Sequence, residues 1–210
     1  MRGGFSPTIG GRTSERARLT DGAVIGIVTN ITDPDGLSRV RVKFPSISDQ
    51  DESFWARIAV PMAGDDRGTY FPLAVDDEVL VIFGHLREPF VVGALWNGKE
   101  KPPASRSDQC VIKSRSGHVI RLNDAGGNQT VEIVDGSGKN GIVIDTTNNT
   151  ITISAQKDIT LSAPKGTITL AAQKVVMKAS VDGELSAGAG GMKVHADGDL
   201  TVTGKTVNLN

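Results

Sequence analysis

The sequence predicts an all-β protein in two parts, a small closed barrel followed by a repetitive stalk that can fold only within an oligomer. Two observations lead to this prediction. Every Phe, Trp and Tyr lies at or before Trp96, and residues 97–210 contain none. Short runs of aliphatic and β-branched residues recur in that aromatic-free part at a nearly constant spacing. Because large aromatic side chains normally fill a globular core, the second part is expected to be narrow, with a thin aliphatic core.

Composition excludes several classes of protein. The 210 residues carry 23 basic and 24 acidic side chains, so the net charge of −1 gives no general affinity for nucleic acid or an anionic membrane. The single cysteine, Cys110, excludes an internal disulfide and is typical of a protein made in a reducing cytoplasm. Residues 1–11 lack the apolar run of a signal peptide, and no segment has the roughly 20 apolar residues of a membrane-spanning helix.

Four segments are expected along the chain. Residues 1–21, rich in Gly and Arg, form a flexible arm, which is either a disordered tail or a segment that becomes ordered on a partner. Residues 22–98 form the barrel. Residues 99–109, which contain two consecutive prolines, form a linker, and residues 110–210 form the stalk.

The barrel is predicted from short strands that are separated by turn residues. The second strand alternates regularly, with Val40, Val42 and Phe44 on one face and basic side chains on the other, which indicates a half-buried strand. Gly26 inside the first strand predicts a bulge or a bend. The five predicted strands are residues 23–31, 39–44, 54–60, 78–83 and 90–96. This many short strands within residues 22–98 are typical of a barrel of the OB type.

The stalk repeats with a period of about eight residues, which is the signature of a fibre or solenoid. The aliphatic residues that open successive runs lie 7 to 9 residues apart, apart from one doubled gap after Val175. They are Ile142, Ile151, Ile159, Ile168, Val175, Met192, Leu200 and Val207. Each unit provides only one face of a core, which is too little for a monomeric β-helix. We therefore expect three chains wound about one axis, each providing one face at every level.

Alternation within each unit identifies the side chains that would meet on this axis, since Thr, Lys and Asp would face water. The predicted axial residues are Ile142, Ile151, Ile153, Ile159, Leu161, Ile168, Leu170, Val175, Leu200, Val202 and Val207. The predicted fold class is thus an N-terminal OB barrel followed by an intertwined triple-stranded β-helix stalk in a homotrimer. Such a rod would be stiff, because compression must break many hydrogen bonds together.

No catalytic, cofactor-binding or metal-binding group is predicted, and the chain is not expected to be an enzyme. Cys110 has no histidine near it in sequence, and His118 lies in a turn that leads into a strand. The acidic run Asp76-Asp77-Glu78 opens a strand and is interpreted as a solvated cluster. The glycine-rich residues 188–191 precede no predicted helix, so they form no phosphate loop.

Particular blocks of the sequence resemble a known family. Residues 22–28 and 33–45 resemble the opening of the OB domain of phage baseplate assembly protein V and of the VgrG spikes of type VI secretion. Residues 54–61 and 77–83 are similar to the blocks that follow. Residues 89–98 look like the last strand of that domain, and residues 112–124 like the opening of the stalk.

The resemblance implies a homotrimeric central spike in the baseplate at the tip of a phage tail or injection particle, assembled in the bacterial cytoplasm. It would dock beneath the tube hub and pierce the target envelope when the sheath contracts, so it would meet the target membrane only transiently. Because about 21 residues precede the barrel, a separate hub protein is expected. The histidines His85, His118 and His195 form no His-x-His pair of the kind that binds iron at some spike tips, so a PAAR-type tip protein is expected at the C-terminal end.

Two alternatives stay open at this point. An OB barrel could be a nucleic-acid-binding module, for which Arg39, Arg41 and Lys43 offer the only basic strand face. The near-zero net charge argues against this, and no nucleic acid is expected as a partner. The chain could also be the trimeric stalk of a tail fibre or adhesin, although the stalk lacks exposed aromatics that would bind glycans. A β-helical carbohydrate-active enzyme is disfavoured by the short period.

Overall fold

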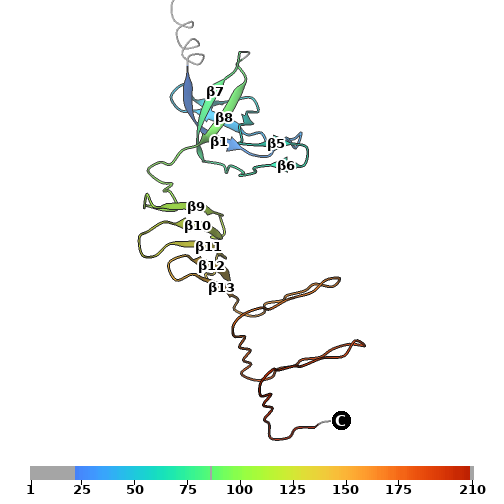
Figure 1. Ribbon diagram of the computed structural model, residues 1–210. Helices are drawn as coiled ribbons and strands as arrows, with labels where there is room; N and C mark the ends of the chain where they lie inside the picture. The colour runs from blue at the N-terminus through green and yellow to red at the C-terminus, as the bar shows by residue number, and fades with distance from the viewer. Residues whose placement is uncertain (1–21, 86, 209–210) are drawn as a thin grey trace, which may run out of the picture. The chain divides into compact units, whose positions relative to one another are not determined.

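The computed structural model describes residues 22–85 and 87–208, and within them every assigned element is a β-strand (Figure 1). The prediction of an all-β fold is therefore confirmed. The chain divides after Gln156 into two units. The arm predicted over residues 1–21 lies outside the described residues.

Six strands form the first sheet, in the order β3-β2-β1-β7-β8-β4. They are β1 (Ala23–Asn30), β2 (Arg41–Phe44), β3 (Ser48–Glu52), β4 (Arg57–Ile58), β7 (Glu78–Phe83) and β8 (Pro89–Ala94). All neighbours are antiparallel except β4 and β8, which are parallel. A separate hairpin consists of β5 (Ala63–Gly64) and β6 (Arg67–Gly68).

The two ends of this sheet meet and close a barrel. The amide of Val40 donates to the carbonyl of Ala56 at 3.0 Å, and the amide of Ala56 donates to the carbonyl of Val40 at 2.7 Å. Val40 directly precedes β2 and Ala56 directly precedes β4, so β3 and β4 act as two halves of one interrupted strand beside β2. The result is the small five-stranded barrel of the OB type that the sequence predicted.

The barrel core is made of aliphatic side chains and one aromatic pair. The alternation predicted for the second strand is confirmed, because Val40, Val42 and Phe44 are all buried. The rings of Phe44 and Phe83 lie 5.5 Å apart between centroids, within the range of favourable aromatic pairs. The buried cluster comprises Val28, Val40, Val42, Phe44, Ala56, Val79, Val81 and Val91.

Strand β3 was missed by the sequence analysis, and the strand predicted over residues 54–60 is shorter than expected. β3 is entirely polar, Ser-Asp-Gln-Asp-Glu, and therefore carries no β-branched or alternating signal. Only residues 57–58 of the predicted third strand are strand, and Ala56 adds an isolated bridge. By contrast, β7 spans the predicted residues 78–83.

Gly26 lies where β1 passes close to the core side chains of β2. Residues 23–27 pair with β7, whereas residues 27–30 pair with β2. The register with β7 is uninterrupted at Gly26, and the irregularity lies further along, between Val28 and Asn30. A Cβ at Gly26 would lie 2.2 Å from Cγ1 of Val42, so only glycine allows this close approach.

The second sheet is an antiparallel meander of five strands, each paired with the next. Its strands are β9 (Gln109–Lys113), β10 (Val119–Asn123), β11 (Thr130–Val134), β12 (Gly141–Asp145) and β13 (Thr150–Ser154) (Figure 1). This differs from the interwoven path expected from residue 110 onward, because these strands pair within one chain. Tight turns between the strands explain why they pair within one chain. For example, the carboxylate of Asp135 accepts hydrogen bonds from Ser137, Lys139 and Asn140 and returns the chain between β11 and β12.

The close approach of Gly26 to Val42 leads to a stability prediction. Gly26→Ala should lower the free energy of unfolding of the barrel by about 1–3 kcal/mol, because the added methyl group overpacks the core against Val42. Denaturant titration followed by tryptophan fluorescence measures this, since Trp55 and Trp96 both lie in or beside the barrel. Gly98→Ala is the matched control, because a Cβ there meets nothing within 4 Å. Equal stability of the two variants would contradict the packing argument.

Candidate assembly site

The meander places its aliphatic side chains in two rows on one face. In register across the five strands, the first row is Ile112, Ile120, Ile133, Ile142 and Ile153. The second row is Cys110, Leu122, Val131, Ile144 and Ile151. Since side chains alternate between the faces of a strand, residues two apart share a face and the two rows together form one surface. We call this surface the stalk face.

The stalk face is open to solvent in the single chain, whereas the opposite, polar face is better covered. Ile153 is 56% exposed, while Asn123 on the polar face is only 6% exposed. On the polar face Arg121 and Glu132 form an ion pair at 2.8 Å. A contiguous apolar surface of this kind is unusual on a monomer and marks an interaction site. Inside the sheet the backbone bonds are made within the chain, whereas in the described part of the chain the outer edges of β9 and β13 have no strand beside them and the stalk face has no packing partner.

Residues 157–208 are incomplete in both respects. They contain no assigned strand, and Ala163 is the only one of them that is not classed as exposed. Within this segment the backbone–backbone hydrogen bonds are two local turns, from Gly166 to Ala163 and from Gly191 to Gly188. Backbone amides and carbonyls in folded proteins are nearly always paired. Residues 157–208 have the β-prone sequence of strands, but most of their backbone amides and carbonyls lack the hydrogen-bond partners that strands require.

The predicted axial residues are exposed in the single chain, and the structure brings only three of them together. Ile142 and Ile153 lie in the first row of the stalk face, and Ile151 lies in the second. The other eight lie in residues 157–208: Ile159, Leu161, Ile168, Leu170, Val175, Leu200, Val202 and Val207. Their meeting on an axis stays a prediction. Sequence reasoning did not assign the earlier members of the stalk face, from Cys110 to Ile133, although each shows the same alternation.

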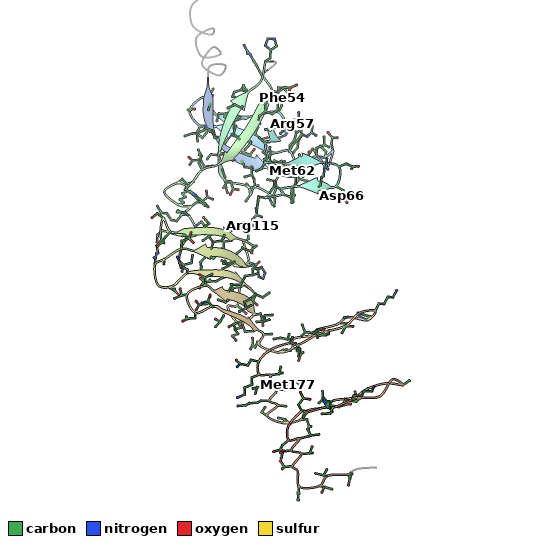
Figure 2. The ribbon with its side chains drawn as sticks, viewed as in Figure 1. Phe54, Arg57, Met62, Asp66, Arg115 and Met177 are labelled. Carbon is green, nitrogen blue, oxygen red and sulfur yellow. The ribbon has the colours of Figure 1, made fainter. Side chains whose placement is uncertain are left out.

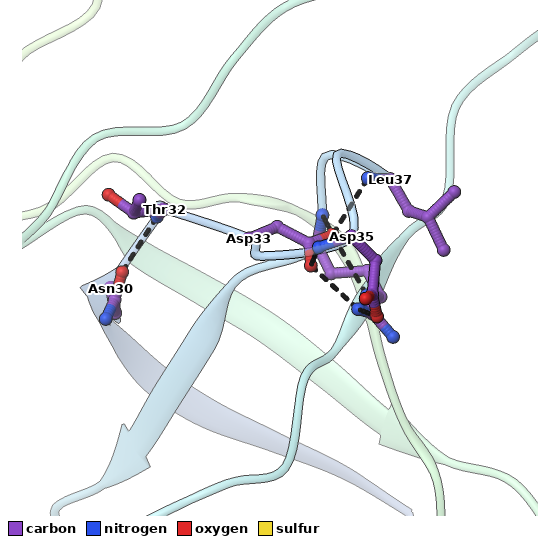
Figure 3. A network of polar contacts seen from close by, with 6 residues as sticks. Asn30, Thr32, Asp33, Asp35 and Leu37 are labelled. Carbon is purple, nitrogen blue, oxygen red and sulfur yellow. Dashed lines mark hydrogen bonds and ion pairs between the residues drawn. The ribbon is translucent and has the colours of Figure 1, made fainter.

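A loop of the barrel folds around a buried carboxylate (Figure 3). The side chain of Asp33 is 2% exposed and accepts the guanidinium of Arg39, with its Nε at 2.9 Å and its Nη2 at 2.7 Å. Backbone amides of Asp35, Leu37 and Arg39 donate to the same carboxylate at 3.0–3.1 Å. The Arg39 guanidinium holds the pKa of Asp33 well below its usual range. Arg39 also pairs with Asp35.

The basic strand face is consequently less available than its sequence indicates. Arg39 is committed to the Asp33 loop, and Arg41 approaches the carboxylate of Glu52 at 3.4 Å. Both guanidinium groups lie over the ring of Trp55, at 5.9 and 5.0 Å from its centroid. Arg39 and Arg41 thus contact acidic side chains and the ring of Trp55. Among the described residues, only Lys43 of the three basic residues has no such contact, so this face has little free charge with which to bind a nucleic acid.

The residues considered for chemistry have local structural roles. Nδ1 of His118 accepts the amide of Gly136 at 3.1 Å and joins two turns. Asp77 accepts the amide of Ala74 at 2.7 Å and closes the turn before β7. Cys110 is exposed at the end of the second row of the stalk face. Across residues 22–85 and 87–208, no three potential metal ligands gather.

A helix long and apolar enough to cross a bilayer is not found in the described part of the chain.

The described residues thus form an OB barrel, a β-meander with an exposed apolar face and a β-prone segment with few backbone partners. Residues 24–96 match the family model of the type VI secretion system/phage-baseplate injector OB domain. The barrel therefore matches the injector OB domain, and the resemblance seen in the sequence of this domain is confirmed. The match supports a structural role in a baseplate. The curated proteins contain no match to this chain.

The Asp33 loop leads to a prediction on pH. Because the pKa of Asp33 is depressed in the folded barrel, its stabilising effect is present above its unfolded value of 3.8 and is lost as the pH falls below that value. We expect the denaturation midpoint of the barrel to fall on acidification below about pH 4. Asp33→Asn should lower the midpoint at pH 7 and flatten this dependence. Tryptophan fluorescence titrations at several pH values measure both effects.

The matched control is Asp76→Asn, which removes an exposed carboxylate from the same domain. It should keep the acid dependence of the parent chain. If Asp33→Asn kept that dependence as well, other carboxylates would be responsible for it.

Proposed function

We propose that three copies of this chain assemble into the central spike of a contractile injection device. The OB domains dock beneath the tube hub, and the stalk pierces the target envelope when the sheath contracts. The observation that supports this most directly is the open stalk face of β9–β13, followed in sequence by a β-prone segment without backbone partners. The injector-type OB domain supports a baseplate as the place of action.

The two parts of the stalk join in different ways. In residues 109–154 the strands pair with one another within the chain, so copies join mainly through side chains, with three stalk faces turned toward a common axis. In residues 157–208 the backbone groups are open, so strands pair between chains. An eight-residue unit supplies one short face, and at least three such faces are needed to enclose an axial core.

This construction suits a mechanical task. Strands stacked at about 4.8 Å give roughly 40 Å of rod for nine units. Axial load on such a rod is shared by hydrogen bonds at every level, and interwoven chains cannot separate without breaking many of them. Small aliphatic residues, in place of aromatics, allow three side chains to share each level.

The proposal includes partners at both ends of the spike. A separate hub protein covers the OB domains, and a PAAR-type tip protein caps the C-terminal end of the stalk. The spike is assembled in the bacterial cytoplasm, acts in the baseplate at the tail tip and contacts the target membrane only during penetration. No nucleic acid, cofactor or catalytic step is part of this function.

A tail-fibre or adhesin stalk would share the stalk face, but the type of barrel favours the spike. An injector OB domain is expected in a baseplate spike and has no evident purpose in a receptor-binding fibre. The nucleic-acid alternative is weakened by the engagement of Arg39 and Arg41 with acidic side chains.

The trimer leads to a test in one strand. By light scattering the full chain should have three times its 22.1 kDa mass. Ile153→Asp should reduce this mass toward that of one chain, because three carboxylates would be buried at one level of the axis without partners. Thr152→Asp, on the opposite face of β13, should leave the trimer intact. A trimer that tolerates both substitutions would place the interface elsewhere.

The place of action leads to a second test. Antibodies against the full chain, marked with gold, should label contractile particles from the producing bacterium at the baseplate end. Particles from a strain that lacks the gene are the control and should show no label. Label along the sheath, or on fibres that extend from the particle, would contradict the spike assignment and favour a fibre stalk.

A further inference from the structure

A second apolar surface lies on the outside of the OB barrel. Ile25, Ile82 and Val92 are 51%, 43% and 45% exposed, although the residues that alternate with them, such as Val81 and Val91, are fully buried in the core. The register places Ile25 opposite Leu80 on β7, and Ile82 opposite Phe90 on β8. Strands β1, β7 and β8 therefore present one continuous apolar patch, which we call the outer face.

Strand β8 continues this patch. Phe90 and Val92 flank the buried Val91, so alternation places both on the side away from the core, next to Leu80 and Ile82. A β-bulge follows directly, because Leu80 pairs with Gly93 while Val81 pairs with Val91, and Val92 is the extra residue. Bulges are often features of specific sites.

One cation stands at the edge of the outer face. Arg57 on β4 is exposed and pairs in register with Phe90, and its guanidinium carbon lies 5.8 Å from the centroid of that ring. Among the described residues no carboxylate lies within ion-pair distance of Arg57, unlike Arg39 and Arg41. The outer face is thus apolar with a positive rim.

The hairpin β5–β6 has the complementary character. It consists of two paired positions outside the barrel sheet, and all four of its strand residues are exposed. Its tip carries Asp65 and Asp66, and exposed Met62 directly precedes it. Figure 2 shows Met62 and Asp66 on this segment and Arg57 on the barrel. Because an isolated two-stranded hairpin is marginally stable in water, this one is expected to pack on another surface.

We propose that the β5–β6 hairpin of one copy packs on the outer face of a second copy, with Asp66 beside Arg57 and Met62 against Ile82 and Val92. This inference rests on the proposed homotrimer, whose stalk would hold the OB domains at high effective concentration. The charges match, and both surfaces belong to this chain. Because the contact joins two different patches, it is heterologous and closes a ring when three copies have made it.

Disulfide capture between chains tests this contact. In a Cys110→Ala background, chains with Met62→Cys and chains with Val92→Cys are co-expressed with different tags and mildly oxidised. On a denaturing, non-reducing gel we expect a band of two chains that contains both tags. A single chain with both substitutions should give covalently closed trimers. Leu37→Cys in place of Val92→Cys is the control, since Leu37 is exposed on the β1–β2 loop.

Light scattering on the same samples separates this inference from the proposed function. A trimeric mass without the mixed band overturns the hairpin contact and leaves the trimeric spike in place. A monomeric mass without the band overturns both. A bond formed within one chain, or a band equally strong with Leu37→Cys, also overturns the contact.

Discussion

The need to pair backbone amides and carbonyls governs this chain from one end to the other. In the barrel, backbone groups pair within the domain, and the Val40–Ala56 bridge closes the sheet. In β9–β13 the meander meets it as well, but leaves the stalk face uncovered. In residues 157–208 the backbone–backbone hydrogen bonds are two local turns, and every residue except Ala163 is exposed. The chain therefore leaves more of its backbone and apolar surface unpaired toward residue 208, which is where the proposed trimer would supply partners.

The parts of the fold that sequence predicted are those in which burial follows a simple period. Val40, Val42 and Phe44 alternate with basic residues, and each of them lies in the core. Strand β3 has no such signal, since its five polar residues pair through their backbone at an edge of the sheet. The hairpin β5–β6 was missed for a similar reason, because two residues per strand are too few to show a period.

The stalk shows a different limit of sequence reasoning. A run such as Thr150–Ser154 indicates a strand but does not say whether its neighbour belongs to the same chain. Turns decide this, and the Asp135 turn, with its several hydrogen bonds to the carboxylate, favours return within the chain. The first row of the stalk face was missed before Ile142 because Ile120 and Ile133 are 13 residues apart, which interrupts the eight-residue spacing of Ile112 and Ile120.

The OB barrel also shows how a fold that binds nucleic acid in other settings can become an assembly part. The strand 2–3 face and the loop between the first two strands are common ligand sites of this fold. Here Asp33 and Arg39 lock that loop, and Arg41 is shared between Glu52 and Trp55. The exposed apolar surface of this barrel lies instead on β1, β7 and β8. Since function depends on such surfaces and not on the fold, a closed ligand face and an open outer face fit the proposed contact between copies better than they fit nucleic-acid binding.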